Sequence, residues 1–102
     1  MEAMELYSLI PYGKKNAITR AELMTKTGMQ DRQIRDIISY IRINSHAICS
    51  TSKGAGYYRP ANRQELQEFI DETENRAKST FAILKTAKAE LRRDYHQLEF
   101  GF

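Results

Sequence analysis

The sequence predicts a mainly α-helical fold with one small β-hairpin, ending in a single long helix. Three observations support this prediction. Four isoleucines recur at the spacing of one helix face, namely Ile34, Ile37, Ile38 and Ile41. Two short β-prone segments, residues 47–51 and 57–59, surround a turn that contains glycine. No glycine or proline occurs between residues 61 and 100, so nothing there interrupts a helix.

The length and composition indicate one folded domain with one appended element. Hydrophobic residues make up 41% of the 102 residues and charged residues 28%, a balance that excludes disordered and collagen-like classes. A second full core would need a longer chain. Pro60 and Asn62 mark the clearest boundary in the pattern. We therefore expect a domain over residues 1–60 and a long helix within residues 61–102.

Two short helices open the predicted domain. The first covers roughly residues 2–10 and is ended by Pro11, and residues 17–18 can form a short strand. Thr19 and Glu22 have the spacing of a capping box, which predicts a helix that begins there and runs to about residue 26. Gly28 suits a left-handed C-cap after it. The side chains expected to face the core are Ala21, Leu23 and Met24.

The next helix begins near Gln30 or Asp31 and presents its isoleucines on one side. Two helices joined by a turn of about four residues, the second with a basic outer face, have the layout of a helix-turn-helix. The predicted hairpin follows directly, in the position of a wing. Since side chains alternate along a strand, one of Tyr57 and Tyr58 should be buried and the other exposed. The predicted fold is thus a winged helix-turn-helix followed by one long C-terminal helix.

Residues 4–60 resemble the winged-helix domain of the biotin-operon-repressor type, which also occurs in small helix-turn-helix proteins of phages and mobile elements in Gram-positive bacteria. The most specific part of the likeness is the spacing from the recognition helix to the Gly-x-Gly-Tyr wing. The resemblance implies binding to double-stranded DNA, and it implies no biotin chemistry. The residues that resemble the family are Gly28, Met29, Gln30, Ile34, Ile38, Ile41, Arg42, Ile48, Lys53, Gly54, Ala55, Gly56, Tyr57 and Tyr58.

Arginines on the second helix of the motif are the main candidates for contacts with DNA bases. Arg32 and Arg35 are three residues apart, so they share a helix face, and a guanidinium matches the O6 and N7 acceptors of guanine. The alternative is that both pair with Asp31 and Asp36 on a solvated face. Gln33 can contact adenine or point along the surface.

Other candidates suit the DNA backbone. Ser39 lies one turn beyond Arg35, and Lys53 at the wing tip can contact a phosphate or the minor groove, or stay solvated. Thr19 and Arg20 begin a helix whose free N–H groups suit phosphate. The full predicted DNA-binding set is Thr19, Arg20, Gln30, Arg32, Gln33, Arg35, Asp36, Ser39 and Lys53.

The long helix, predicted over residues 62–93, has a seven-residue apolar repeat typical of a coiled coil. Its first part, with Leu66, Phe69 and Ile70, can instead fold back onto the domain. The remainder would then expose apolar side chains, so we expect the helix to join two copies. The predicted oligomerisation residues are Leu66, Ile70, Ala77, Phe81, Leu84, Leu91 and Tyr95.

Charge is divided unevenly along the chain, with nine Lys and Arg against five acids in residues 1–60 and seven against eight in residues 61–102. The basic surplus therefore lies in the predicted winged domain. We expect sequence-specific binding to double-stranded DNA as a small dimer, as in transcriptional regulators or phage and mobile-element replication accessory factors. The alternative is a protein-interaction module whose C-terminal helix docks a partner.

Enzyme chemistry is not expected. His46 and His96 lie far apart, and no nucleotide loop or nucleophile with base can be found, so we expect no catalytic residue, metal or cofactor. A lone cysteine, Cys49, can form no internal disulfide. The acidic N-terminus and the lack of a long apolar run predict a soluble cytoplasmic protein without a membrane contact.

Overall fold

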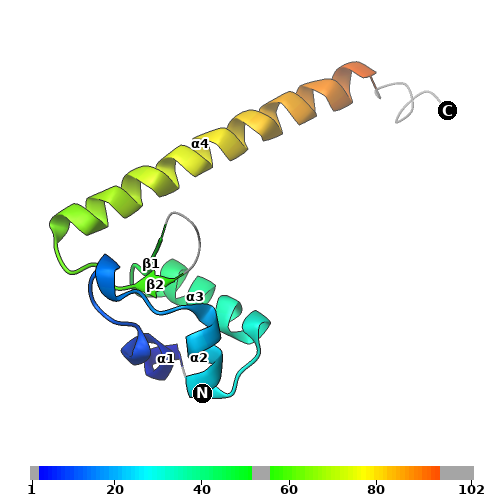
Figure 1. Cartoon of the computed structure of the whole chain (residues 1–102). Coiled ribbons are helices and arrows are strands. Elements are labelled where there is room, and N and C mark those ends of the chain that lie inside the picture. The colour runs from blue at the N-terminus through cyan, green and yellow to red at the C-terminus, as the bar shows by residue number, and fades with distance from the viewer. Residues whose placement is uncertain (1–2, 52–55, 95–102) are drawn as a thin grey trace. The chain divides into compact units, whose positions relative to one another are not determined.

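The computed structural model describes residues 3–51 and 56–94 (Figure 1). In chain order the elements are α1 (Ala3–Leu9), the 3₁₀ turn η1 (Lys14–Asn16), α2 (Arg20–Thr27), α3 (Asp31–Asn44), β1 (Cys49–Ser50), β2 (Tyr57–Tyr58) and α4 (Arg63–Asp94). Three short helices, a two-stranded antiparallel hairpin and a long C-terminal helix are the predicted fold class, which is therefore confirmed. The chain divides into two compact units, one ending at Phe69 and the other beginning at Ile70.

Local signals set both ends of α2 as the sequence predicts. The Thr19 hydroxyl accepts the Glu22 N–H at 3.1 Å, and the Glu22 carboxylate accepts the Thr19 N–H at 3.1 Å, which completes the capping box. The Thr19 N–H first, and then the Thr19 O–H, donate hydrogen bonds to the Glu22 carboxylate and lower its pKa. Gly28 ends the helix with a φ of 73°, a left-handed conformation that favours glycine.

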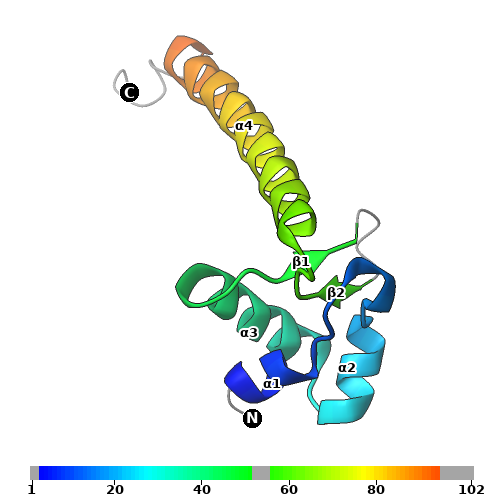
Figure 2. The same cartoon turned by 90° about the vertical axis from the view of Figure 1, so that its left-hand side faces the viewer.

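The core of the first unit lies where α1 and α2 pack against α3 (Figure 2). Its largest fully buried side chains are Leu6, Ile10, Leu23, Ile34, Ile38, Ile41, Ile48 and Cys49. The prediction that Ala21 and Met24 are buried was wrong, because both are exposed. The eight-residue α2 packs mainly on α3, so only the side that carries Leu23 is covered.

The hairpin is shorter than predicted and is joined by single bridges to the segment before α2. β1 and β2 pair antiparallel, with Cys49 opposite Tyr58 and Ser50 opposite Tyr57. The strand expected at residues 17–18 is one antiparallel bridge between Ile18 and Tyr57. Tyr57 belongs to the core cluster and Tyr58 is only 3% exposed, so both faces of β2 are covered and the prediction of one exposed tyrosine was wrong.

The first two turns of α4 belong to the first unit. The Asn62 side chain accepts the Glu65 N–H at 2.9 Å and so caps the helix, as the spacing of these residues suggests. The Glu65 carboxylate in turn accepts the N–H groups of Ala61 at 2.9 Å and Lys14 at 3.1 Å. These backbone hydrogen bonds, that of Ala61 first, lower the pKa of Glu65. One carboxylate thus joins the start of α4 to η1.

The second unit contains the rest of α4, which continues to Asp94 as the sequence predicts. No helix in the described part of the chain is both long enough and apolar enough to cross a membrane.

Candidate nucleic-acid interface

The burial of one side of α3 determines which of its residues can meet a partner. Ile34, Ile38 and Ile41 are at most 2% exposed. At about 100° per residue, Arg32, Asp36, Ser39 and Ile43 fall on the opposite side, and all four are exposed. We call these four residues the outer stripe of α3. The predicted contacts Arg32, Asp36 and Ser39 therefore share one accessible surface.

Asp31 joins two of the predicted DNA-binding arginines. One carboxylate oxygen lies 2.7 Å from Nε of Arg20, and the other lies 3.0 Å from Nε of Arg35. Arg20 is the first residue of α2 and Asp31 the first residue of α3, so the bridge holds the two helix starts together. All three side chains are more than a third exposed, which limits the stability that the bridge adds.

Arg20 makes a further contact with the hairpin. A hydrogen bond and charge interaction with Tyr57, followed by the charge of Asp31, raise the pKa of Arg20 above its ordinary value. The guanidinium therefore stays fully charged and is held near β2. Sequence alone could suggest the pairing of Arg35 with Asp31, four residues apart on one helix, but not the contacts of Arg20.

Arg32 differs from Arg20 and Arg35, which both pair with Asp31. Within residues 3–51 and 56–94, no ion pair or hydrogen bond engages its side chain, which is exposed on the outer stripe. The alternative expectation, in which acids neutralise both arginines of α3, therefore fits Arg35 but not Arg32. Arg32 is the described cation on α3 that is best placed to contact a polyanion.

Two other predicted contacts act partly in helix capping. The Gln33 side-chain oxygen accepts the N–H of Gln30 at 3.0 Å and so stabilises the start of α3. The Thr19 hydroxyl is engaged with Glu22 in the cap of α2. These side chains lie near the bridged helix starts, yet the polar atoms named here already have partners inside the protein. Lys53 lies outside the described residues.

Two further arginines stabilise the first unit, a role that the sequence does not indicate. Arg42 donates through Nε to the Ile48 carbonyl at 2.8 Å, and its guanidinium lies 5.7 Å from the Tyr57 ring centre and 5.6 Å from that of Phe69. Arg59 donates to the Ile10 carbonyl and lies over two tyrosine rings. Cation–π contacts of this kind attach the hairpin and the start of α4 to the helices.

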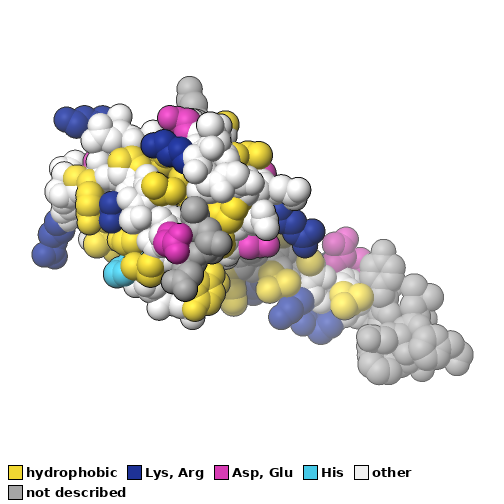
Figure 3. Space-filling model, turned by 90° about the horizontal axis from the view of Figure 1, so that it is seen from below, with side chains coloured by type: hydrophobic (Ala, Val, Ile, Leu, Met, Phe, Trp, Pro, Cys, Tyr) yellow, Lys and Arg dark blue, Asp and Glu magenta, His cyan; other side chains and the backbone are white. Residues whose placement is uncertain are grey.

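Basic side chains form no single patch on the face seen in Figure 3, where Lys and Arg lie among apolar and neutral side chains. On this face, charge density therefore does not mark an interface by itself. The helix-borne geometry of Arg20, Arg32 and Arg35 is the more specific signal.

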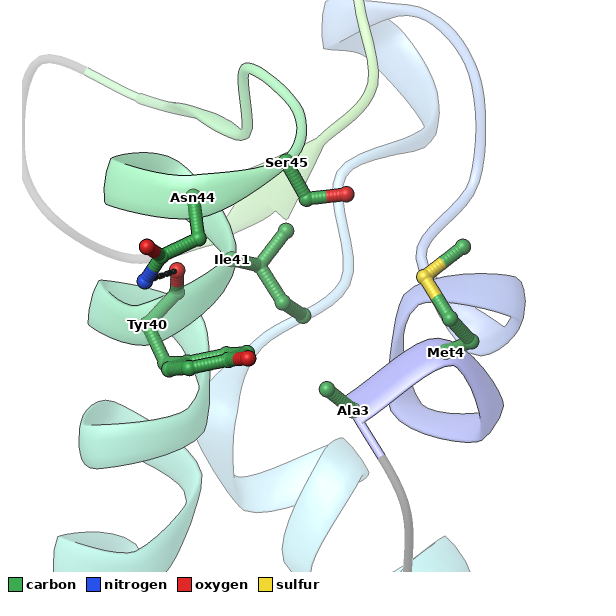
Figure 4. A pocket seen from close by; sticks show the side chains of 6 residues that line it. All are labelled: Ala3, Met4, Tyr40, Ile41, Asn44 and Ser45. Carbon is green, nitrogen blue, oxygen red and sulfur yellow. Dashed lines mark hydrogen bonds between the residues drawn. The ribbon is translucent and has the colours of Figure 1, made fainter.

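A shallow pocket of about 360 Å³ lies between α1 and α3 (Figure 4). Its lining carries no acid, base or histidine and consists of Ala3, Met4, Tyr40, Ile41, Asn44 and Ser45. The Asn44 amide within it donates to the Tyr40 carbonyl at 3.0 Å. Among the residues described, no three His, Cys, Asp or Glu side chains are grouped to hold a metal ion. The pocket therefore offers surface for packing rather than groups for acid–base chemistry.

The predicted oligomerisation residues divide between the two units. Leu66 lies in the first unit and is half-buried, like Phe69 beside it. In the second unit Phe81 is 69% exposed, and Ile70, Ala77, Leu84 and Leu91 are exposed as well. Tyr95 lies beyond the described part of α4. An apolar series is therefore accessible from Ile70 onward.

Comparison with known proteins gives no matching family model, no match among curated proteins and no match among solved structures.

Proposed function

We propose that this protein binds double-stranded DNA in a sequence-specific manner through the outer stripe of α3. The observation that best supports the proposal is Arg32, an exposed and unpaired guanidinium among the described residues, on a helix whose opposite side is buried. Arg20 and Arg35 lie beside it, held by Asp31. A helix that exposes one polar side and is packed on two others can enter a major groove.

Some residues of this face would contact DNA bases and others the phosphate backbone, as in other protein–DNA interfaces. Arg32 would contact a base edge, with guanine as the best match for its paired donors. Arg20 and Arg35 would contact phosphates, as would Ser39 and the wing residue Lys53. Binding of this kind would serve a cytoplasmic transcriptional regulator or a phage or mobile-element replication accessory factor, with no catalytic step.

A second candidate function is docking to a protein. The outer stripe ends in Ile43, which is 78% exposed, and it also carries the acid Asp36. Tyr40 and Met4, beside the pocket between α1 and α3, are 60% and 51% exposed. Exposed apolar side chains of this kind suit a protein partner better than a phosphate backbone.

The test is a salt titration of binding to duplex DNA by the full chain and by the double variant Arg32→Glu, Arg35→Glu. The wild-type protein should bind random duplex at about 50 mM salt and lose affinity steeply toward about 200 mM. The affinity of the double variant for duplex DNA should be about a hundredfold lower, because two cations become two anions beside phosphates.

The matched control is Lys26→Glu with Lys78→Glu, which makes the same change in net charge away from the outer stripe. Circular dichroism first establishes that both double variants are folded. If the control loses as much affinity as the α3 variant, only net charge matters and the assigned face is wrong. If wild-type protein does not bind DNA even at low salt, the DNA proposal fails and protein docking becomes the better account.

A further inference from the structure

The part of α4 in the second unit has one apolar side that no described residue of this unit covers. Taking Ile70 as the first position of a seven-residue repeat, Ala77, Leu84 and Leu91 follow at the same position. Ile70 is 39% exposed, Leu84 47% and Leu91 52%. Phe81 lies at the edge of this series and is 69% exposed. We call these five residues the α4 seam.

The charges of α4 are separated along its length. Five acids and one arginine occur in residues 63–75, whereas six basic residues and two acids occur in residues 76–94. The acids of the first half are Glu65, Glu68, Asp71, Glu72 and Glu74, and the basic residues of the second half are Arg76, Lys78, Lys85, Lys88, Arg92 and Arg93. The helix therefore has an acidic half and a basic half.

The helix dipole does not account for this separation. Its effect is confined to the first and last turns, whereas the acids continue to Glu74 and the basic residues begin at Arg76, near the middle. The separation of acidic and basic residues also places like charges close together within the single helix. Glu68 and Glu72 repel each other at a spacing of four residues, as do Lys88 and Arg92. A partner with the reverse order of charges would relieve this repulsion.

A second copy of the same helix has that reverse order only when it runs antiparallel. Phe81 is seven residues after Glu74 and seven residues before Lys88, and all three share one edge of the α4 seam. In an antiparallel pair that crosses at Phe81, Glu74 of each copy lies opposite Lys88 of the other. The two contacts are related by the twofold axis and bring opposite charges together.

A parallel pair offers no such match. In a parallel coiled coil, a residue on the edge that carries Glu74 and Lys88 lies beside a residue of the partner helix. That residue is five positions earlier in the sequence and lies on the opposite edge of the partner's seam. Glu74 would then meet Phe69 and Lys88 would meet Ile83, so neither charge finds an opposite charge. The acidic halves would also lie side by side. Charge thus favours the antiparallel arrangement over the parallel one.

We propose that the α4 seam binds a second copy of this chain in an antiparallel pair that crosses near Phe81. The apolar residues of the seam supply the buried area, and the pairs of Glu74 with Lys88 set the direction. This interaction goes beyond DNA binding and is measurable without DNA. It survives if the proposed DNA interface fails.

Charge exchange tests the pairing by sedimentation equilibrium of the full chain. Glu74→Lys and Lys88→Glu should each weaken self-association by about tenfold, because each turns two attractive pairs into repulsive ones. The double variant Glu74→Lys, Lys88→Glu should regain most of the loss. Glu72→Lys makes the same charge change as Glu74→Lys on the side of α4 that is directed away from the seam; it is the control and should leave self-association unchanged.

Spin labels test the direction independently, in a Cys49→Ala background. At about 1.5 Å per residue, labels at position 64 of two antiparallel copies lie about 50 Å apart, and labels at position 86 about 15 Å. A parallel pair would give short distances at both positions. Short distances at position 64, failure of the double variant to recover, or a purely monomeric protein would each overturn the proposal. The last result would leave the seam to a different partner.

Discussion

Replacing Asp31 by asparagine tests whether its carboxylate holds Arg35 back from the proposed contact with DNA. The amide keeps the size of the side chain but removes the charge that attracts Arg20 at 2.7 Å and Arg35 at 3.0 Å. The Arg35 guanidinium should then be free to reach a phosphate, whereas Arg20 keeps its contact with Tyr57. The variant therefore exchanges a small amount of stability for DNA affinity.

The loss of stability follows from the exposure of the three side chains. Exposed ion pairs contribute about 0.2–1 kcal/mol each, and a negative charge in the first turn of a helix adds about 0.3–1 kcal/mol. Asp31→Asn should therefore cost about 1 kcal/mol of the free energy of unfolding. In a domain of this size that corresponds to a fall of about 4–8 °C in Tm.

The gain in DNA binding should appear in its salt dependence. Each cation that newly contacts a phosphate makes the slope of log K against log salt more negative by about 0.9. With Arg35 released, the slope should steepen by about 1. Fluorescence anisotropy with a labelled duplex over a series of salt concentrations measures this slope.

Asp36→Asn is the matched control, since it removes the same charge from the outer stripe of α3 without breaking an ion pair found among the described residues. It should raise affinity slightly with little change in slope or Tm. Equal slopes for the two variants would refute the idea that Asp31 restrains Arg35. A loss of affinity in Asp31→Asn would show instead that the bridge positions the arginines for binding.

Three further predictions concern stability. Thr19→Ala removes the hydroxyl that accepts the Glu22 N–H and should cost about 1 kcal/mol in urea unfolding; an unchanged midpoint would contradict the cap. Gly28→Ala should cost about 1–2 kcal/mol through its φ of 73° alone, because a Cβ there meets nothing within 4 Å, and a more stable variant would contradict this. The pKa of Glu65 is lowered in the folded protein. Its carboxylate therefore stabilises the fold at pH values above the ordinary pKa of 4.5, and this stabilisation is lost as the pH falls through the folded-state pKa. Glu65→Gln should therefore be less stable than wild type at pH 7, and this deficit should shrink as pH falls below 4.5, whereas a deficit that does not change with pH would rule out the carboxylate as the cause.

Several local features of the fold were predictable from short stretches of sequence. The capping box of Thr19 and Glu22, the left-handed Gly28 and the cap of α4 by Asn62 all depend on residues within four positions of each other. Their hydrogen bonds close within one turn of helix, so spacing alone reveals them. The isoleucine stripe of α3 is predictable for the same reason.

The errors arose where burial depends on distant segments. Met24 occupies an apolar position on α2, but no element among the described residues covers that side of the helix. Tyr57 and Tyr58 alternate as in any strand, yet both faces of β2 are covered, since Tyr57 packs in the core cluster and Tyr58 is also buried. Strand alternation predicts exposure only when one face of the strand is open.

In the candidate site, too, some features follow from the sequence and others from tertiary structure. The positions of Arg32, Asp36 and Ser39 on the exposed side of α3 follow from the period of the helix, which the sequence determines by itself. Whether an arginine has an ion-pair partner also depends on tertiary structure. Packing of α2 against α3 brings Arg20 within 2.7 Å of Asp31, which is eleven positions later in the chain. Arg42 likewise contacts Ile48, Tyr57 and Phe69 only after the chain has folded. A periodic pattern assigns a side chain to a face, whereas its hydrogen bonds and charge partners depend on which segments the core brings together.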